Sequence, residues 1–427
     1  MTVMRSSRAP RALGILLALL AAAAPAAPQQ LLVPMDDAQT NHLKAYGLTY
    51  QALERGYTAE WLLNYRSGAF LLPDDPLLRR EAALRGVAVE PVGPSAVADI
   101  KAGIRQANQE VVVLEKAPEI AVYTPENASP WDDAVTLALT YAEIPYEKVW
   151  DPDVLQGRLE QYDWLHLHHE DFTGQYSKFF INFAGAAWLQ EEVERNQAVA
   201  AEFGAPDVPA LKKRVSEAIR SYVAEGGFLF AMCTATETVE LALAAHDVDI
   251  AAPFADGTPA APDATSRMEW GRTLAFRDAE IQTNPAINAF SDIDGHQVNT
   301  AWRQPLGTFT LFDFSAKFDP VPSMLVQNHE TVLPGFYGLT TSFRTDRLKP
   351  GVIVLAQEEG APWAKYIHGS FGEGTWTFLG GHDPEDPQHE VGDEPTNLDL
   401  HPHSAGYRLI LNNVLFPAAK KKTLKTD

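Results

Sequence analysis

Residues 225–237 read EGGFLFAMCTATE, and this stretch decides the fold class. The two glycines at 226–227 end a long helix that we expect over 209–225. The apolar run 228–232 that follows predicts a buried strand, and a second helix is expected after Cys233. Apolar strands that alternate with helices are typical of a parallel sheet whose two faces are covered.

The same alternation continues on both sides of this stretch. It predicts an α/β fold with a flavodoxin-like, mostly parallel sheet and helices on both faces. Further strands are expected at 31–34, 60–65, 87–92, 120–123, 146–150, 164–168, 352–357, 363–368 and 376–379, and further helices at 39–55, 76–84, 96–107, 131–141 and 153–161.

The chain of 427 residues is longer than a single hydrophobic core usually organises. Pro118 marks a boundary, because proline disfavours helix in the residue before it. We therefore expect an N-terminal α/β lobe and a larger second domain. The predicted divisions are a signal peptide at 1–28, the lobe at 29–117, the larger domain at 118–417 with an irregular, β-rich insertion at about 251–350, and a basic tail at 418–427.

The first residues have the pattern of a secretory signal peptide. Arg5, Arg8 and Arg11 precede the apolar run 12–24, and small residues offer a cleavage site near Gln29. The run is shorter than the roughly 20 residues that span a bilayer. The sequence therefore predicts a soluble protein that is exported to the periplasm or the extracellular space, with no transmembrane segment.

The formal net charge is −22, and it becomes −25 when the three leader arginines leave. A surface of this charge repels nucleic acid and anionic lipid. We therefore expect no nucleic-acid partner. The partners that remain open are a small molecule, a peptide or a carbohydrate.

The apolar strand ends at Cys233, the only cysteine of the chain, so no intramolecular disulfide can form. A cysteine between a strand and a helix lies on a tight turn, and the small residues Ala231 and Ala235 allow the bend. This is the pattern of a nucleophile elbow. Cys233 is the candidate nucleophile, and Thr234 and Glu237 are expected beside it. The alternative is a small buried apolar residue.

The stretch TFLGGHDPE at 377–385 predicts a strand that ends in two glycines and a histidine. A thiol nucleophile needs a base within hydrogen-bond reach and a group that orients the base. His382 is the candidate base, and Glu385 or Asp383 is the candidate acid. Because parallel strands place their carboxyl ends at one edge of a sheet, we expect the Cys233 thiol and the His382 ring to meet there.

The cysteine elbow, the later stretch YIHGSFGEG at 366–374 and the GHDP stretch at 381–384 resemble the class I glutamine amidotransferase-like superfamily. The later two stretches are most similar to its trehalose-utilisation branch. The resemblance covers roughly residues 119–417, except the insertion.

This resemblance implies a flavodoxin-like sheet and, in catalytic members, a Cys-His-Glu triad that hydrolyses an amide through a thioester. Cys233 and His382 fall on the positions of the nucleophile and the base. Glu385 stands three residues after the histidine, where the acid of the family usually stands two residues after it. Glu126 is a further candidate pocket residue.

The whole chain also resembles exported bacterial proteins that are labelled asparagine synthetase B. The sequence shows neither an amino-terminal cysteine nucleophile nor a glycine-rich, ATP-binding synthetase motif. We therefore do not expect an ATP-dependent asparagine synthetase.

Seven of the twelve histidines fall in two short windows, 166–169 and 382–403. Alternation along a strand places His166 and His168 on one face, with His169 past its end. Imidazole with carboxylate suits zinc or a similar ion. A divalent ion is therefore the one cofactor that the pattern suggests, with His166, His168, His169 and Glu170 as candidate ligands. A solvated polar rim is the alternative.

Three functions remain open at this point. The first is a cysteine-dependent hydrolase or amidase that acts on an amide or ester through Cys233, His382 and a carboxylate. The second is a non-catalytic cell-envelope protein that recognises a carbohydrate or a peptide, with aromatic residues of the insertion such as Trp302 and Tyr337 as a stacking surface. The third is a metal-dependent hydrolase that uses the histidine-rich rim.

Overall fold

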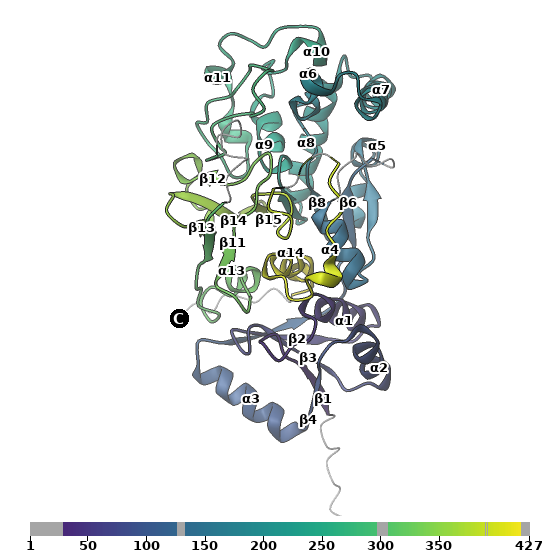
Figure 1. Cartoon of the computed structure of the whole chain (residues 1–427), viewed down its shortest axis with the longest axis vertical. Helices are drawn as coiled ribbons and strands as arrows, with labels where there is room; N and C mark the ends of the chain where they lie inside the picture. The colour runs from purple at the N-terminus through teal and green to yellow at the C-terminus, as the bar shows by residue number, and fades with distance from the viewer. Residues whose placement is uncertain (1–28, 126–132, 297–305, 389, 391, 420–427) are drawn as a thin grey trace, which may run out of the picture.

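The computed structural model describes residues 29–125, 133–296, 306–388, 390 and 392–419. The predicted signal peptide, Glu126, Trp302 and nearly all of the basic tail lie outside the described residues. The described chain forms two sheets, and helices pack against them (Figure 1). The protein is therefore a mixed α/β protein.

The N-terminal lobe contains a five-stranded sheet in the order β4-β1-β3-β2-β5. All of its strand pairs are antiparallel, so the parallel arrangement that we expected from residue 31 onward is wrong for this lobe. The reason is the strand at 69–73, which the sequence analysis did not identify and which turns the chain back on itself. The strands are β1 Gln30–Val33, β2 Ala59–Leu63, β3 Ala69–Pro73, β4 Glu90–Val92 and β5 Glu110–Leu114; the helices are α1 His42–Glu54, α2 Pro76–Arg85 and α3 Pro94–Gln106.

The larger sheet is mixed. One half consists of parallel neighbours in the order β15-β9-β8-β6-β7. The predicted apolar strand before Cys233 lies near the middle of this half and is fully buried. The strands are β6 Ile120–Tyr123, β7 Glu147–Val149, β8 Trp164–Leu167, β9 Phe228–Met232 and β15 Gly374–Leu379.

The other half of the sheet is antiparallel. Strand β14 pairs with β15, and β13, β10 and β11 continue from it in that order, while β12 pairs with β14. Three of these strands come from the predicted insertion, whose described residues otherwise form short helices and loops. The strands are β10 Thr308–Leu311, β11 Val332–Pro334, β12 Phe343–Arg344, β13 Ile353–Glu358 and β14 Trp363–Phe371.

Helices cover both faces of the parallel half, as the sequence predicts. Alternate residues of β9 enter different cores: Phe230 packs in the core that includes α4 and α14, and Leu229 packs in the core that includes α8 and α9. The helices are α4 Ala134–Ala142, α5 Asp151–Leu155, α6 Phe180–Phe183, α7 Ala187–Glu202, α8 Val208–Ala224, α9 Ala235–Ala244, α10 Pro253–Asp256, α11 Ala264–Arg267, α13 Pro320–Leu325 and α14 Ala405–Leu415. Short 3-10 turns are η1 Arg158–Gln161, η2 Tyr176–Lys178, η3 Trp270–Arg272, η4 Thr345–Arg347, η5 Leu398–Leu400 and η6 Phe416–Ala418.

The first core also joins the lobe to the larger domain. Helix α1 of the lobe packs against α4 and α14, and Figure 1 shows α14 between the two sheets. The buried guanidinium of Arg408 on α14 donates to the carbonyl oxygens of Met35 (3.0 Å) and Ser67 (2.8 Å) in the lobe. The junction is therefore held by both apolar packing and a buried cation.

None of the helices in the described ranges has the length and apolar composition to cross a bilayer.

Candidate functional site

The carboxyl ends of three adjacent parallel strands meet at one edge of the larger sheet. Strand β8 ends just before His168, β9 ends just before Cys233, and β15 is followed by two glycines and His382. The backbone N–H of Cys233 donates to the carbonyl oxygen of Gly381 at 3.2 Å, so the two strand ends are in direct contact. The structure therefore brings the backbones of the predicted nucleophile and base to the same place.

Four histidines and one aspartate gather at this edge, the aspartate and His169 partly buried and the others buried, and we call them the histidine cluster: Asp133, His166, His168, His169 and His382. His166 Nε2 lies 3.2 Å from His168 Nδ1, and His168 Nε2 lies 3.0 Å from His382 Nδ1. Asp133 Oδ1 lies 3.5 Å from His166 Nε2 and 3.4 Å from His168 Nδ1. The sequence prediction that His166 and His168 share one face is thus confirmed.

Hydrogen bonding restricts which ring nitrogen of each histidine carries a proton. His166 Nδ1 lies 3.0 Å from the carbonyl oxygen of Phe230, which can only accept, so this nitrogen is protonated. In the neutral ring the lone pair of His166 Nε2 then faces the Asp133 carboxylate. A proton on His168 Nδ1 faces two acceptors, Asp133 Oδ1 and His166 Nε2.

Charge and burial shift the pKa values in this cluster in opposite directions. Burial lowers the pKa of His166. Burial also opposes the charged form of His168, but the Asp133 carboxylate outweighs this effect and raises the pKa of His168. For Asp133, burial is outweighed by the two histidines, and the pKa is lowered well below its ordinary value. The carboxylate is therefore ionised.

Asp133 is a ligand candidate that sequence reasoning missed. Its side chain caps α4 by accepting from the backbone N–H groups of Val135 and Thr136, which explains an aspartate before this helix. The available signal was an acidic residue after β6, since this strand neighbours β8 and ends at the same edge.

Glu170, the carboxylate predicted as a metal ligand, accepts from the backbone N–H of His168 at 3.1 Å. Burial, and secondarily the Asp133 charge, raises its pKa to about 7. The carboxylate that lies against both His166 and His168 is Asp133.

Cys233 occupies a strained turn. Its φ of 49° lies in the left-handed region that L-residues rarely adopt, as a nucleophile elbow requires. The side chain is 2% exposed, and Sγ lies 3.7 Å from Thr234 Oγ1. A Cβ at Gly338 would lie 3.0 Å from this sulfur, so a glycine is needed there. Burial raises the thiol pKa, and backbone N–H groups, that of Leu339 foremost, oppose the rise only in part.

The carboxylates predicted to orient His382 have other contacts. Asp383 Oδ2 accepts from the hydroxyls of Tyr407 (2.8 Å) and Thr396 (2.7 Å). Glu385 lies 2.9 Å from His401 Nδ1. The group that contacts the His382 ring through Nδ1 is His168.

Glu237, predicted beside the cysteine, is buried in the first turn of α9. It accepts from the hydroxyls of Ser291 and Thr340, and so joins α9 to the insertion. Burial raises its pKa to about 7.

The second histidine window of the sequence does not form one site. His401 pairs with Glu385, whereas His403 Nδ1 lies 2.9 Å from Nδ1 of His42 in the lobe. His389 lies outside the described residues. Histidines that are close in sequence therefore need not share a site, whereas histidines that follow adjacent parallel strands do come together.

No protein-family model and no curated protein matches the sequence. Among solved structures, a cytoplasmic protein from Salmonella typhimurium LT2 is 12% identical with a TM-score of 0.35, and another cytoplasmic protein from Salmonella typhimurium is 10% identical with a TM-score of 0.34. Each is covered completely and covers 71% of this chain. A GH42 beta-galactosidase is 12% identical with a TM-score of 0.24, over 63% of this chain and 28% of that enzyme. Similarity at this level supports no conclusion about function.

Proposed function

We propose that the chain is an exported hydrolase that uses a divalent transition-metal ion held by Asp133, His166 and His168. One observation carries the proposal: Asp133 Oδ1, His166 Nε2 and His168 Nδ1 form a triangle with sides of 3.2, 3.4 and 3.5 Å. Ligands about 2.1 Å from a tetrahedral zinc ion lie about 3.4 Å apart. The three atoms therefore have the spacing of three zinc ligands.

The surrounding contacts support the same assignment. Histidines that bind metal usually donate their other N–H group to a carbonyl or another acceptor, which fixes the ring. The contact of His166 with the Phe230 carbonyl is of this kind. His168 has the equivalent contact with His382 through its second nitrogen. Both outer contacts leave the inner nitrogens available to a cation.

Three protein ligands leave a fourth position for water, as in catalytic zinc sites. A zinc ion held there would lower the pKa of its bound water to about 7 and would supply hydroxide for the hydrolysis of an amide or ester at neutral pH.

The test begins with the metal content of the purified protein. Zinc is removed with a chelator, zinc, cobalt or manganese is returned, and hydrolysis of nitrophenyl esters and amides is measured. We expect one ion per chain and activity that disappears and returns with the metal. His166→Ala should abolish both, whereas the matched variant His246→Ala, at an exposed histidine, should keep both. Full activity in the metal-free protein would refute the proposal.

A second candidate is the cysteine-dependent hydrolase. The specific observation in its favour is the positive φ of Cys233, next to the strand end that carries His382. Here Cys233 is the nucleophile and His382 the base, and His168 with Asp133 takes the place of the orienting acid predicted at Glu385. Cys233→Ala decides between the candidates, because it abolishes the activity only in this mechanism.

We also propose the finer fold assignment. Numbered in chain order, β7-β6-β8-β9-β15 corresponds to 2-1-3-4-5, the order of flavodoxin-like sheets. This order supports the resemblance to the class I glutamine amidotransferase-like superfamily. Export is supported by the basic and apolar pattern of residues 1–28. Sequencing the amino terminus of the secreted protein tests it, with cleavage expected near Gln29.

A further inference from the structure

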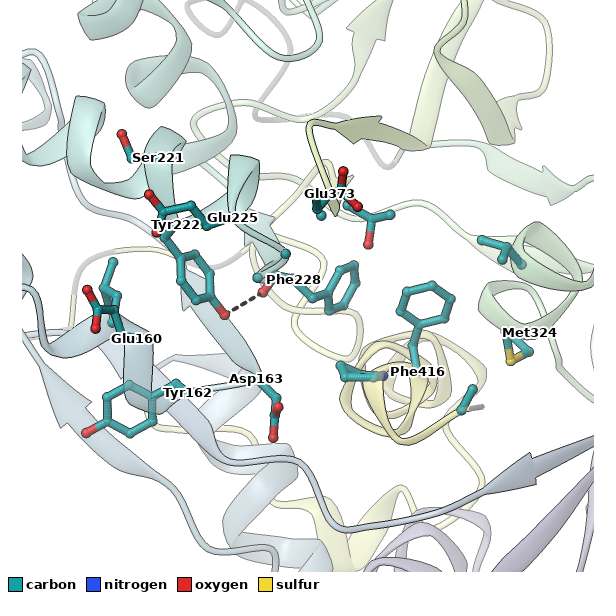
Figure 2. Close-up of a pocket in the computed structure, with 18 of the residues that line it drawn as sticks. Glu160, Tyr162, Asp163, Ser221, Tyr222, Glu225, Phe228, Met324, Glu373 and Phe416 are labelled. Atoms are coloured by element: carbon teal, nitrogen blue, oxygen red, sulfur yellow. Dashed lines mark hydrogen bonds between the residues drawn. The ribbon is translucent and has the colours of Figure 1, made fainter. Parts of the chain in front are cut away.

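Figure 2 shows a large cleft. Its lining includes the starts of the parallel strands, at the edge opposite to the histidine cluster. Its volume is about 1110 Å³. Asp163 before β8, Phe228 at the start of β9 and Thr375 near the start of β15 line it. Other walls come from the end of α5 with η1, the end of α8, α13, η6 and Val112 of the lobe.

The floor of this cleft is apolar and aromatic. Phe228 and Met324 are buried, and Phe416 is partly buried between them in Figure 2. Tyr222 is fixed by a hydrogen bond from its hydroxyl to the carbonyl oxygen of Phe228, at 3.4 Å. These side chains offer an apolar surface with a fixed shape.

The charged residues that line the cleft are all acidic: Glu160, Asp163, Glu225, Asp319 and Glu373. Asp163 pairs with Lys116 at 2.8 Å. Within the described part of the chain, the other four carboxylates have no ion-pair partner. The rim therefore has uncompensated negative charge around an apolar floor.

One wall carries a strongly exposed aromatic ring. Phe318 is 78% exposed, the largest fraction among the exposed large apolar side chains of the described residues. It lies beside Asp319, which precedes α13. The ring therefore adds exposed apolar surface next to a carboxylate in the lining of the cleft.

We propose that this cleft binds a short peptide segment in which apolar side chains are flanked by lysine or arginine. The volume lies near the upper end of the roughly 300–1,000 Å³ of typical small-molecule pockets, so the cleft has room for several side chains. The acidic rim favours cationic side chains and excludes anionic partners. The apolar floor receives the side chains between them. This proposal is independent of the metal site, because no ligand candidate lines the cleft.

The test measures anisotropy of a fluorescein-labelled ten-residue peptide of alternating leucine and lysine, titrated with the full mature chain. The control peptide has glutamate in place of lysine. We expect the lysine peptide to bind at low salt and to weaken as salt rises, and the glutamate peptide not to bind.

Matched variants separate cleft binding from general attraction to an acidic protein. Glu160→Gln with Glu225→Gln should weaken binding about tenfold or more. Glu191→Gln with Glu194→Gln removes the same charge from α7, outside the cleft, and should change binding less than about twofold. Phe318→Ser should also weaken binding. Equal losses in both double variants would overturn the proposal. It would also be overturned if an alkylammonium detergent binds and displaces the peptide while Phe318→Ser leaves the affinity for the peptide unchanged.

Discussion

The two ends of the parallel strands in the larger sheet differ in burial and in polarity. At the carboxyl edge, His166 and His168 are fully buried against a carboxylate. The amino edge is open, with an apolar floor and an acidic rim. The same strands supply both edges, since β9 runs from Phe228 in the cleft to the residue before Cys233.

This difference follows from what each edge must stabilise. Buried polar groups persist only when they are paired, and the histidine cluster offers convergent lone pairs that suit a cation. Exposing an apolar surface costs less free energy than burying unpaired polar groups, and exposed apolar patches commonly mark binding sites. The two edges thus separate the proposed chemistry from the proposed recognition of a peptide.

The largest effect is expected where the lobe joins the larger domain. Arg408→Met removes a buried cation that donates to Met35 and Ser67 and lies 2.9 Å from His329. The acceptors are left unpaired, so we expect a loss of about 3–5 kcal/mol in the free energy of unfolding, measured with urea. The exposed control Arg80→Met should lose less than about 0.5 kcal/mol. A similar small loss for Arg408→Met would show that the lobe is held by apolar packing alone.

At the carboxyl edge, Asp133→Asn separates the two roles of this residue. Asparagine caps a helix as well as aspartate does, so α4 should keep its cap, and the metal-free protein should lose only the pairing of the carboxylate with the histidines. The carboxylate ligand is lost, and zinc affinity should fall by about 100-fold or more, beyond what outer contacts usually contribute. Competition with a zinc chelator measures the affinity. An unchanged affinity would restrict Asp133 to its role as a cap.

Glu237 gives a prediction about pH. Its pKa is about 7 in the folded chain, above the ordinary 4.5, so the neutral form is favoured by folding. The resulting stability is full below pH 4.5 and is lost as pH rises through 7. Glu237→Gln cannot ionise, so its unfolding free energy relative to the parent should rise by up to about 3 kcal/mol between pH 4.5 and 8.5. A constant difference across this range would contradict the burial of a neutral acid.

The smallest effect on stability is expected at the amino edge. Phe318 is mostly exposed, so Phe318→Ser should change the thermal unfolding free energy by less than about 0.5 kcal/mol. The same substitution should weaken binding of the leucine–lysine peptide to the cleft. A large loss of stability would instead make this ring part of the core, and the contrast between the two edges would lose support.

The sequence predicted those parts of the fold that are indicated by hydrophobic periodicity and by glycines at the ends of helices. The strand at 228–232, the helix before it and the face shared by His166 and His168 all follow from local pattern. The antiparallel lobe does not, because β3 follows a turn with left-handed residues such as Ser67. Pairing direction depends on which strand lies adjacent, and this is a tertiary property.

The sequence predicted where the site lies, but it did not predict which side chains contact one another there. The carboxyl edge followed from the order of elements, and so did the approach of the strand ends at Cys233 and His382. Asp133 was missed because it lies more than 30 residues before the histidines and also serves as a cap. The role of Glu385 with His382 remains a prediction, while the contact seen for Glu385 is His401.

The most direct test of the central claim is X-ray absorption at the zinc edge of the zinc-loaded protein. The account predicts one zinc per chain with nitrogen and oxygen neighbours at about 2.0–2.1 Å, scattering from two imidazoles, and no sulfur. His166→Ala should lose this signal. A sulfur neighbour at about 2.3 Å, which only Cys233 or a methionine could supply, or a protein that retains no zinc, would contradict it.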